Sequence, residues 1–239
     1  MQTVELVAHR GFAGAFPENS LVAIRAALEL GVRFVEIDVL LTRDEHVVLF
    51  HDRTLDRLCG TAGAIHELPL EQVQKLRLRQ AGSASAELSS EHIVELSEVV
   101  ALFESFPEAR LFVEVKRQSI EQHGAELVLR KVLSDIAPIL ERCILISFSH
   151  EILKLAGDQL PTGFILENWE QSTSAELVTL APEYVFCNHT KLPTTGDLEL
   201  PARLVVYEVT DPELARSLTA RGAELIETFQ LVDMIEALQ

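Results

Sequence analysis

Cysteine and aromatic residues are scarce in this chain, whose 239 residues include three cysteines, one tryptophan and two tyrosines. Cys59, Cys143 and Cys187 lie far apart, are odd in number and form no CxxC pair, which argues against a disulfide scaffold and against a zinc cluster. No run approaches the ~20 apolar residues that a membrane-spanning helix needs. The composition therefore fits a reducing, cytoplasmic setting.

Positive charge is also in short supply. The chain has 20 lysines and arginines against 37 aspartates and glutamates, a formal net charge of -17 and a pI near 4.8. This balance argues against capture by nucleic acid or by an anionic membrane, so we expect no nucleic-acid partner and no stable membrane association. The first ten residues, MQTVELVAHR, show neither the basic start and apolar core nor the cleavage site of a leader peptide. A small anionic substrate would have to be attracted by a local metal ion and an arginine.

Hydrophobic residues make up 48% of the chain, enough for one large core, and strand-like runs alternate with helix-like runs. The predicted strands are Val4–Ala8, Phe34–Val39, Leu111–Val115, Ile144–Phe148, Gly163–Leu166, Tyr184–Cys187, Leu204–Val209 and Glu224–Ile226. The predicted helices are Ser20–Leu30, Ile120–Leu133, Glu151–Leu160, Ser174–Leu180 and Pro212–Ala220. Eight strands alternating with helices predict a single (β/α)8 TIM barrel over residues 1–239.

One stretch breaks the alternation. Roughly 60 residues separate His51 from the strand at Leu111, many more than a connection and one helix require. We therefore expect residues 53–109 to form a small insertion between the second and third barrel strands that caps the barrel mouth.

Three carboxylates are expected at the ends of two strands. Glu36 and Asp38 are two residues apart in FVEIDV and so share a face, and Glu114 and Lys116 share a face in LFVEVK. TIM barrels place catalytic groups at the C-terminal ends of their strands. Glu36, Asp38 and Glu114 would hold a divalent cation, and oxygen ligands without thiolates suit Mg²⁺, Ca²⁺ or Mn²⁺ better than Zn²⁺.

These segments occur in a fixed order: HRG at His9, PENS at Pro17, VEIDV at Val35, HD at His51 and VEVK at Val113. The pattern resembles the glycerophosphodiester phosphodiesterases, relatives of the phosphatidylinositol-type phospholipases C. The likeness is close over about the first sixty residues, resumes at LFVEVK and is looser beyond Ser147-Phe148. It implies hydrolysis of a glycerophosphodiester to glycerol 3-phosphate and an alcohol, and it places an insertion at the same point of the barrel.

Hydrolysis of a phosphodiester needs charge neutralisation, a base for the nucleophile and an acid for the leaving oxygen. The metal and a bidentate contact from Arg10 would bind phosphoryl oxygens. His9 and His51 would serve as general base and general acid, since imidazole titrates near working pH. The resemblance further implies that the neighbouring glycerol hydroxyl attacks first, giving a cyclic phosphate that water opens.

Further residues are candidates for substrate binding. The resemblance places Glu18 and Asn19 beside the site, although Asn19 with Ser20 also fits a helix cap and Glu18 a solvated loop. Lys116 would contact phosphate, pair with the metal carboxylates or simply balance charge. Asp52 would orient His51 or a metal-bound water, or shape the turn.

The last third of the chain departs from the family. It has VVYEVT where relatives show an aromatic strand like WTVN, and Ile226-Glu227-Thr228-Phe229 where they show ITD. Tyr207 and Glu208 alternate along the predicted strand, so only one can face the barrel mouth. We expect Tyr207 to face inwards and bind the glycerol carbons, because a fourth inward carboxylate would oppose an anionic substrate.

Other functions remain open from sequence. The nearest is a phospholipase C- or D-like enzyme of the same superfamily; the others are an aldolase that uses Lys116 as a Schiff-base amine and a non-catalytic binding protein. The sequence leaves open the metal, the alcohol, the assignment of acid and base to the two histidines, and the oligomeric state.

Overall fold

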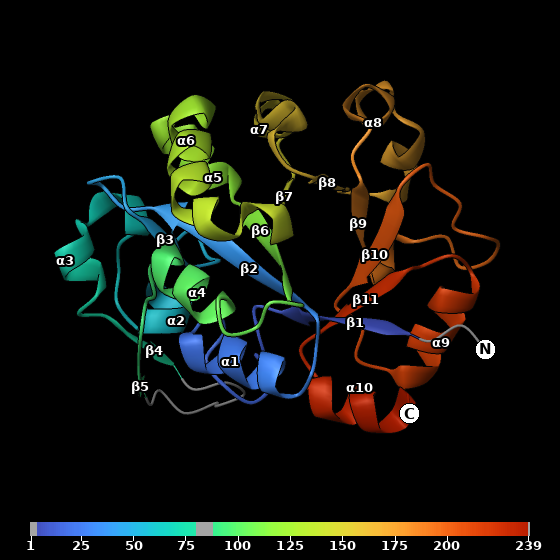
Figure 1. Ribbon diagram of the computed structural model, residues 1–239, viewed down its shortest axis with the longest axis horizontal. Coiled ribbons are helices and arrows are strands. Elements are labelled where there is room, and N and C mark those ends of the chain that lie inside the picture. Colours follow the sequence, from blue (N-terminus) through green and yellow to red (C-terminus); the bar gives the residue numbers. More distant parts are fainter. Residues whose placement is uncertain (1–3, 80–87, 239) are drawn as a thin grey trace.

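The computed structural model describes residues 4–79 and 88–238, and its centre is a closed barrel of eight parallel strands (Figure 1). In barrel order the strands are β1 (Glu5–His9), β2 (Phe34–Leu41), β6 (Arg110–Val115), β7 (Cys143–Ser147), β8 (Thr162–Ile165), β9 (Tyr184–Asn188), β10 (Arg203–Tyr207) and β11 (Leu225–Thr228). Strand β1 pairs with both β2 and β11, which closes the sheet. The predicted TIM barrel is confirmed.

Helices surround the barrel between successive strands. They are α1 (Leu21–Glu29), α4 (Leu96–Phe103), α5 (Arg117–His123), α6 (Ala125–Ile136), α7 (His150–Ala156), α8 (Ala175–Leu180), α9 (Pro212–Ala220) and α10 (Leu231–Leu238), with 3-10 turns η2 (Ala137–Arg142), η3 (Gly157–Gln159), η4 (Trp169–Thr173) and η5 (His189–Lys191). The single helix predicted over Ile120–Leu133 is wrong, because Gly124 takes a φ of +78° between α5 and α6. Within the described ranges, no helix is both long and apolar enough to cross a membrane.

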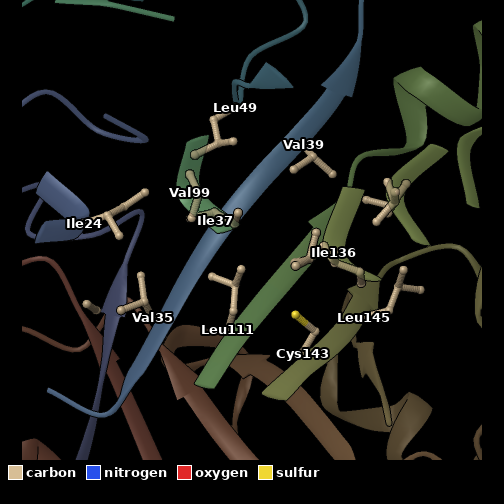
Figure 2. Close-up of a cluster of buried hydrophobic side chains, with 14 of the residues drawn as sticks. Ile24, Val35, Ile37, Val39, Leu49, Val99, Leu111, Ile136, Cys143 and Leu145 are labelled. Carbon is tan, nitrogen blue, oxygen red and sulfur yellow. The ribbon is translucent and has the colours of Figure 1, made fainter. Parts of the chain in front are cut away.

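Strand alternation separates two apolar layers. Outward side chains such as Val35, Ile37 and Leu111 pack against the surrounding helices (Figure 2). Inward side chains fill the barrel: Val7, Phe34, Phe112, Ile144, Ile146, Ile165, Tyr184, Phe186, Val205 and Leu225. Because side chains repeat every two residues, the position two after an inward apolar residue also faces inwards, nearer the carboxyl end of the strand. This register places polar residues at one end of the barrel.

Between β2 and β6 the chain makes an additional excursion. It contains β3 (Val47–Leu49), antiparallel to β2, then α2 (Asp56–Cys59), η1 (Ile65–Glu67), α3 (Leu70–Val73) and the antiparallel pair β4 (Arg77–Arg79) and β5 (Leu88–His92). A separate apolar cluster that includes Leu55, Ile65 and Val73 holds it together, and in Figure 1 it lies to one side of the barrel. Helix α4 follows and packs on the outer core, so the second barrel helix falls inside the range 53–109. Residues 80–87 of that range lie outside the described residues.

Candidate active site

Three carboxylates converge where β2 and β6 lie side by side. Asp38 pairs in register with Glu114, and Glu36 lies two residues earlier on the same face. Oxygens of Glu36, Asp38 and Glu114 lie within 4.8 Å of one another, and each residue is at most 8% exposed. Among the described residues, the buried Oε1 of Glu36 has no hydrogen-bond or ion-pair partner, whereas Asp38 Oδ1 and Glu114 Oε1 face the ammonium of Lys116. Burial and the neighbouring Asp38 raise the pKa of Glu36 well above its ordinary value. Such a donor set fits a hard divalent cation.

A largely buried lysine, with 11% of its side chain exposed, faces this trio. The Nζ of Lys116 lies 2.7 Å from Glu114 Oε1 and 3.2 Å from Asp38 Oδ1. Burial alone would lower the pKa of Lys116, but Asp38 and Glu114 outweigh it and raise the pKa above the usual range. Burial likewise opposes ionisation of Asp38, yet Lys116 and Arg10 hold its pKa far below the usual range. The side chain of Lys116 is therefore an ammonium at neutral pH, held between Asp38 and Glu114.

His9 ends β1 and is almost completely enclosed, with 6% exposure. Its ring stacks on Phe229, with centroids 4.2 Å apart, and its Nε2 lies 3.3 Å from Glu227 Oε1. Burial, followed by the charge of Arg10, lowers the pKa of His9 well below its ordinary value. At neutral pH the ring is an uncharged imidazole that can accept a proton.

His51 follows β3 and is held differently. Its Nδ1 lies 2.8 Å from Asp52 Oδ1, and Arg57 donates to both oxygens of Asp52. Burial would raise the pKa of Asp52, but the hydrogen bonds from His51 and Arg57 bring it well below the usual range. The Asp52 carboxylate thus fixes the ring through Nδ1, as one of the alternatives drawn from the sequence supposed.

Arg10, Glu18 and Asn19 form the support behind these groups. The Arg10 guanidinium donates to Glu18 Oε1 at 2.7 Å and its Nε lies 3.2 Å from Asp38 Oδ2. Asn19 donates to Asp38 Oδ2 and accepts from the Asp38 amide, so both ends of its side chain are engaged. The helix cap belongs to Ser20, whose hydroxyl accepts from the Ala23 amide. Arg10 and Asn19 both have left-handed backbone, with φ of 58° and 57°.

A cavity of about 210 Å³ opens at this end of the barrel. Of the residues selected from the sequence, seven line it: His9, Arg10, Glu36, His51, Glu114, Lys116 and Tyr207. Asp38, Glu18 and Asn19 are not among its lining residues: Asp38 contacts Lys116 and Glu18 contacts Arg10, which both line it, and Asn19 contacts Asp38. For Asn19 the geometry favours positioning of Asp38 over direct contact with substrate.

The expectation that only one of Tyr207 and Glu208 faces the mouth is wrong, because both line the cavity. Alternation holds only while the backbone stays extended. Strand β10 ends at Tyr207, and Glu208 takes a φ of +62°, which turns its side chain back to the same opening.

Glu227 and Phe229 were missed as parts of the site. Glu227 lines the cavity, is 2% exposed and, with His9 and Glu36, forms a second group that can hold a metal ion. The predicted last strand stopped at Ile226, whereas β11 continues to Thr228. The two-residue repeat from the inward Leu225 would have found Glu227, just as it finds His9 after Val7.

Solved structures show the class of fold. A phosphodiesterase of Oleispira antarctica in complex with the product sn-glycerol-3-phosphate is 20% identical, with a TM-score of 0.84 over 99% of this chain and 97% of that one. The glycerophosphodiester phosphodiesterase of Thermotoga maritima is 22% identical, with a TM-score of 0.76 over 99% of both chains. The chain is a (β/α)8 barrel of the form that these proteins share.

Sequence comparison defines the family. The model of the glycerophosphoryl diester phosphodiesterase family matches residues 9–226. The glycerophosphodiester phosphodiesterase of Caldanaerobacter subterraneus subsp. tengcongensis is 32% identical over 188 residues, which cover 75% of each chain. This chain belongs to the glycerophosphoryl diester phosphodiesterase family.

Proposed function

We propose that the protein is a metal-dependent hydrolase that converts glycerophosphodiesters to sn-glycerol 3-phosphate and an alcohol. The observation that carries the proposal is the convergence of His9, His51 and the carboxylates of Glu36 and Glu114 on one cavity, in a member of this family. The relative from Oleispira antarctica, solved with sn-glycerol-3-phosphate, supports the choice of product.

Glu36, Asp38 and Glu114 would hold the metal ion, for which we propose Mg²⁺ or Ca²⁺, with Mn²⁺ also compatible. The buried Oε1 of Glu36, which has no partner among the described residues, supports this role, since such an atom is costly to bury without one. When bound, the ion supplies Lewis-acid polarisation of a phosphoryl oxygen. Lys116 balances the negative charge of Asp38 and Glu114 and faces the opening, where its ammonium can bind phosphate.

His9 and His51 would transfer the protons. In the first step a neighbouring hydroxyl of the glycerol attacks phosphorus and gives up its proton to one imidazole, and the other protonates the departing alcohol oxygen. Water then opens the cyclic phosphate, and the same two groups exchange roles. Arg10 would bind a second phosphoryl oxygen through Nη2, because its Nη1 and Nε already face Glu18 and Asp38 and no contact to Nη2 is formed by the described residues.

Three residues would act by positioning. Glu18 holds Arg10 and Arg57 together, Asn19 fixes Asp38, and Asp52 fixes His51. Tyr207 completes the wall, where its ring meets His9 edge-on, with centroids 6.3 Å apart, and offers an apolar face to the bound diester. Because Glu18 holds Arg10 in place, it contributes to substrate binding indirectly.

We also propose that residues 53–109 border the barrel mouth within the single domain of residues 1–239. The contact of Arg57 with Glu18 and Asp52 supports this arrangement.

We also propose that the protein resides in a reducing, cytoplasmic compartment. The three cysteines are unpaired and buried, and burial raises the pKa of Cys59 to about 11 and that of Cys143 to about 12, which keeps the thiols unreactive.

An aldolase would need Lys116 as a neutral amine, which its raised pKa opposes. The direct test of the proposed activity is release of sn-glycerol 3-phosphate from a panel of glycerophosphodiesters. We expect turnover of at least one diester at neutral pH with added Mg²⁺ or Ca²⁺. Absence of turnover across the panel with every divalent ion would refute the proposed activity.

A further inference from the structure

The side of the cavity opposite the metal carboxylates is aromatic and acidic. We call it the far wall and define it by Phe186, Asn188, Tyr207 and Glu208, which line the cavity from β9 and the end of β10; Phe148, just after β7, borders it. In the order of the barrel, β9 and β10 lie across from β2 and β6. The two arms of a bound phosphodiester therefore meet two different environments.

Glu208 is held in place on this wall. Its Oε2 accepts a hydrogen bond from Asn188 Nδ2 at 2.6 Å. The other end of that amide accepts from the Thr190 amide and from Thr190 Oγ1, so the orientation of Asn188 is itself fixed. Tyr207 and Asn188 are register partners on neighbouring strands, which brings the carboxylate beside the tyrosine. Glu208 is exposed to solvent, and the hydrogen bond from Asn188 anchors its carboxylate at the rim of the cavity.

The backbone conformation at Glu208 also indicates that its carboxylate is directed at the cavity. Its φ of +62° is unfavourable for any residue with a Cβ, and the other residues with this conformation beside the cavity are Arg10 and Asn19. Strained backbone of this kind concentrates at functional sites, where the surrounding structure maintains it. Here it directs towards the opening a carboxylate that a regular strand would have turned outwards.

Arg117 and Lys191 line a neighbouring hollow together with Asn188 and Tyr207, but neither forms an ion pair with Glu208 in the described part of the chain. Among the described residues, no lysine or arginine nitrogen forms an ion pair with Glu208 or with the buried Glu227, whose neighbour is the imidazole of His9. Asp38 and Glu114, by contrast, share Lys116. The cavity thus holds two carboxylates beyond the metal-binding trio, although its substrate carries a negative phosphate.

We propose that the far wall binds the alcohol of the diester and selects cationic amino alcohols, the class of choline and ethanolamine. This inference rests on the proposed function. In such a zwitterionic substrate the phosphate lies against Arg10 and Lys116, and the ammonium lies against Glu208 and the face of Tyr207, where carboxylate and aromatic ring both attract it. Arg117 already lies over the Phe148 ring, 5.2 Å from its centroid, so Tyr207 is the aromatic face that remains available.

The test is the ratio of kcat/KM for glycerophosphocholine to kcat/KM for glycerophosphoglycerol, measured in wild type and variants. The two diesters share the glycerol phosphate, so the ratio cancels damage to the chemistry. We expect Glu208→Gln to lower the ratio about 3- to 10-fold, as removal of one nearby charge in a partly screened site predicts. The matched control is Glu170→Gln, which removes an exposed carboxylate that does not line the cavity and should leave the ratio at its wild-type value.

A second pair of variants tests the ring. Tyr207→Leu should lower the same ratio, and Tyr207→Phe should retain it, because the aromatic face and not the hydroxyl attracts the cation. An unchanged ratio in Glu208→Gln, or an equal fall in Glu170→Gln, would overturn the inference while leaving the diesterase activity intact. Failure of wild type to hydrolyse either diester would instead count against the proposed function, and the inference would fall with it.

Discussion

The two histidines differ in their surroundings, and from this difference we propose a separate role for each. His9 is enclosed and has a lowered pKa, so its neutral form is ready to take a proton. His51 is half-buried, and Asp52 holds its Nδ1, which leaves Nε2 to exchange a proton with the leaving oxygen. We therefore assign His9 as the base for the attacking hydroxyl and His51 as the acid for the alcohol.

This assignment predicts the response to leaving-group chemistry. His9→Ala and His51→Ala should each lower kcat on a glycerophosphodiester by roughly 10²-fold or more, the usual contribution of a positioned acid or base. With a nitrophenyl ester of glycerol phosphate, whose leaving group barely needs protonation, His51→Ala should recover most of its rate and His9→Ala should not. Recovery of the His9 variant alone would reverse the assignment.

Glu227 predicts how stability depends on pH. Burial and the charge of Glu114 raise its pKa well above the ordinary value, whereas in the unfolded chain the pKa returns to about 4.3. Above that value the folded state binds a proton that the unfolded state lacks, so stability from this group is complete at low pH and is lost as pH rises through the folded pKa. One proton changes stability by at most about 1.4 kcal/mol per pH unit.

In the metal-free protein we expect Tm to fall as pH rises from about 4.3 towards the raised pKa of Glu227. Glu227→Gln should show a shallower fall, because glutamine stays neutral throughout. Glu36 and Glu114 also have raised pKa values, so the difference in slope between variant and wild type isolates Glu227. Thermal unfolding with chelator present, at several pH values, measures it; equal slopes would show that Glu227 ionises as freely in the folded state as in the unfolded chain.

At the scale of the elements, the sequence predicted all eight barrel strands, because an apolar run with polar residues at its end marks each one. Their last residues were less predictable. The local sequence of VVYEVT does not show that the backbone turns left-handed at Glu208, a conformation that tertiary contacts such as Asn188 maintain. The break between two helices at Gly124 was also not predictable from the local sequence, because the amphipathic pattern of Ile120–Leu133 continues across it. The face of the sheet on which a side chain lies follows from the periodicity of the sequence, whereas the residue at which a strand ends depends on contacts with residues distant in sequence.

Strand β8 has a glycine where its neighbours carry large inward side chains. A Cβ at Gly163 would lie 2.8 Å from Ile146 Cγ2 and 3.2 Å from Phe186 Cε2, closer than packed atoms approach. We expect Gly163→Ala to lower the free energy of unfolding and Gly163→Val to lower it further, within the range of about 1–3 kcal/mol typical of overpacked cores. Urea unfolding of both variants measures the effect. A stability equal to wild type in the valine variant would show that the barrel interior has unfilled space at this level.

The whole molecule combines a strongly negative net charge of -17 with a site that must accept an anion. Long-range attraction therefore cannot bring the substrate in, and local cations have to do so. Arg10 and Lys116 are largely buried beside the carboxylates, and their ion pairs with Asp38 hold both cations at the cavity. In the proposed mechanism, a divalent ion would neutralise the acidic trio and so allow phosphate to bind.

Turnover with and without metal tests this account most directly. Release of sn-glycerol 3-phosphate from glycerophosphodiesters would be measured for the wild-type protein as purified, after chelation, and after addition of Mg²⁺, Ca²⁺ or Mn²⁺, alongside Asp38→Ala. We predict that chelation abolishes turnover, that at least one of these ions restores it, and that the folded Asp38→Ala protein regains no activity with any of them. Undiminished turnover in excess chelator, or an active Asp38→Ala protein, would contradict the account.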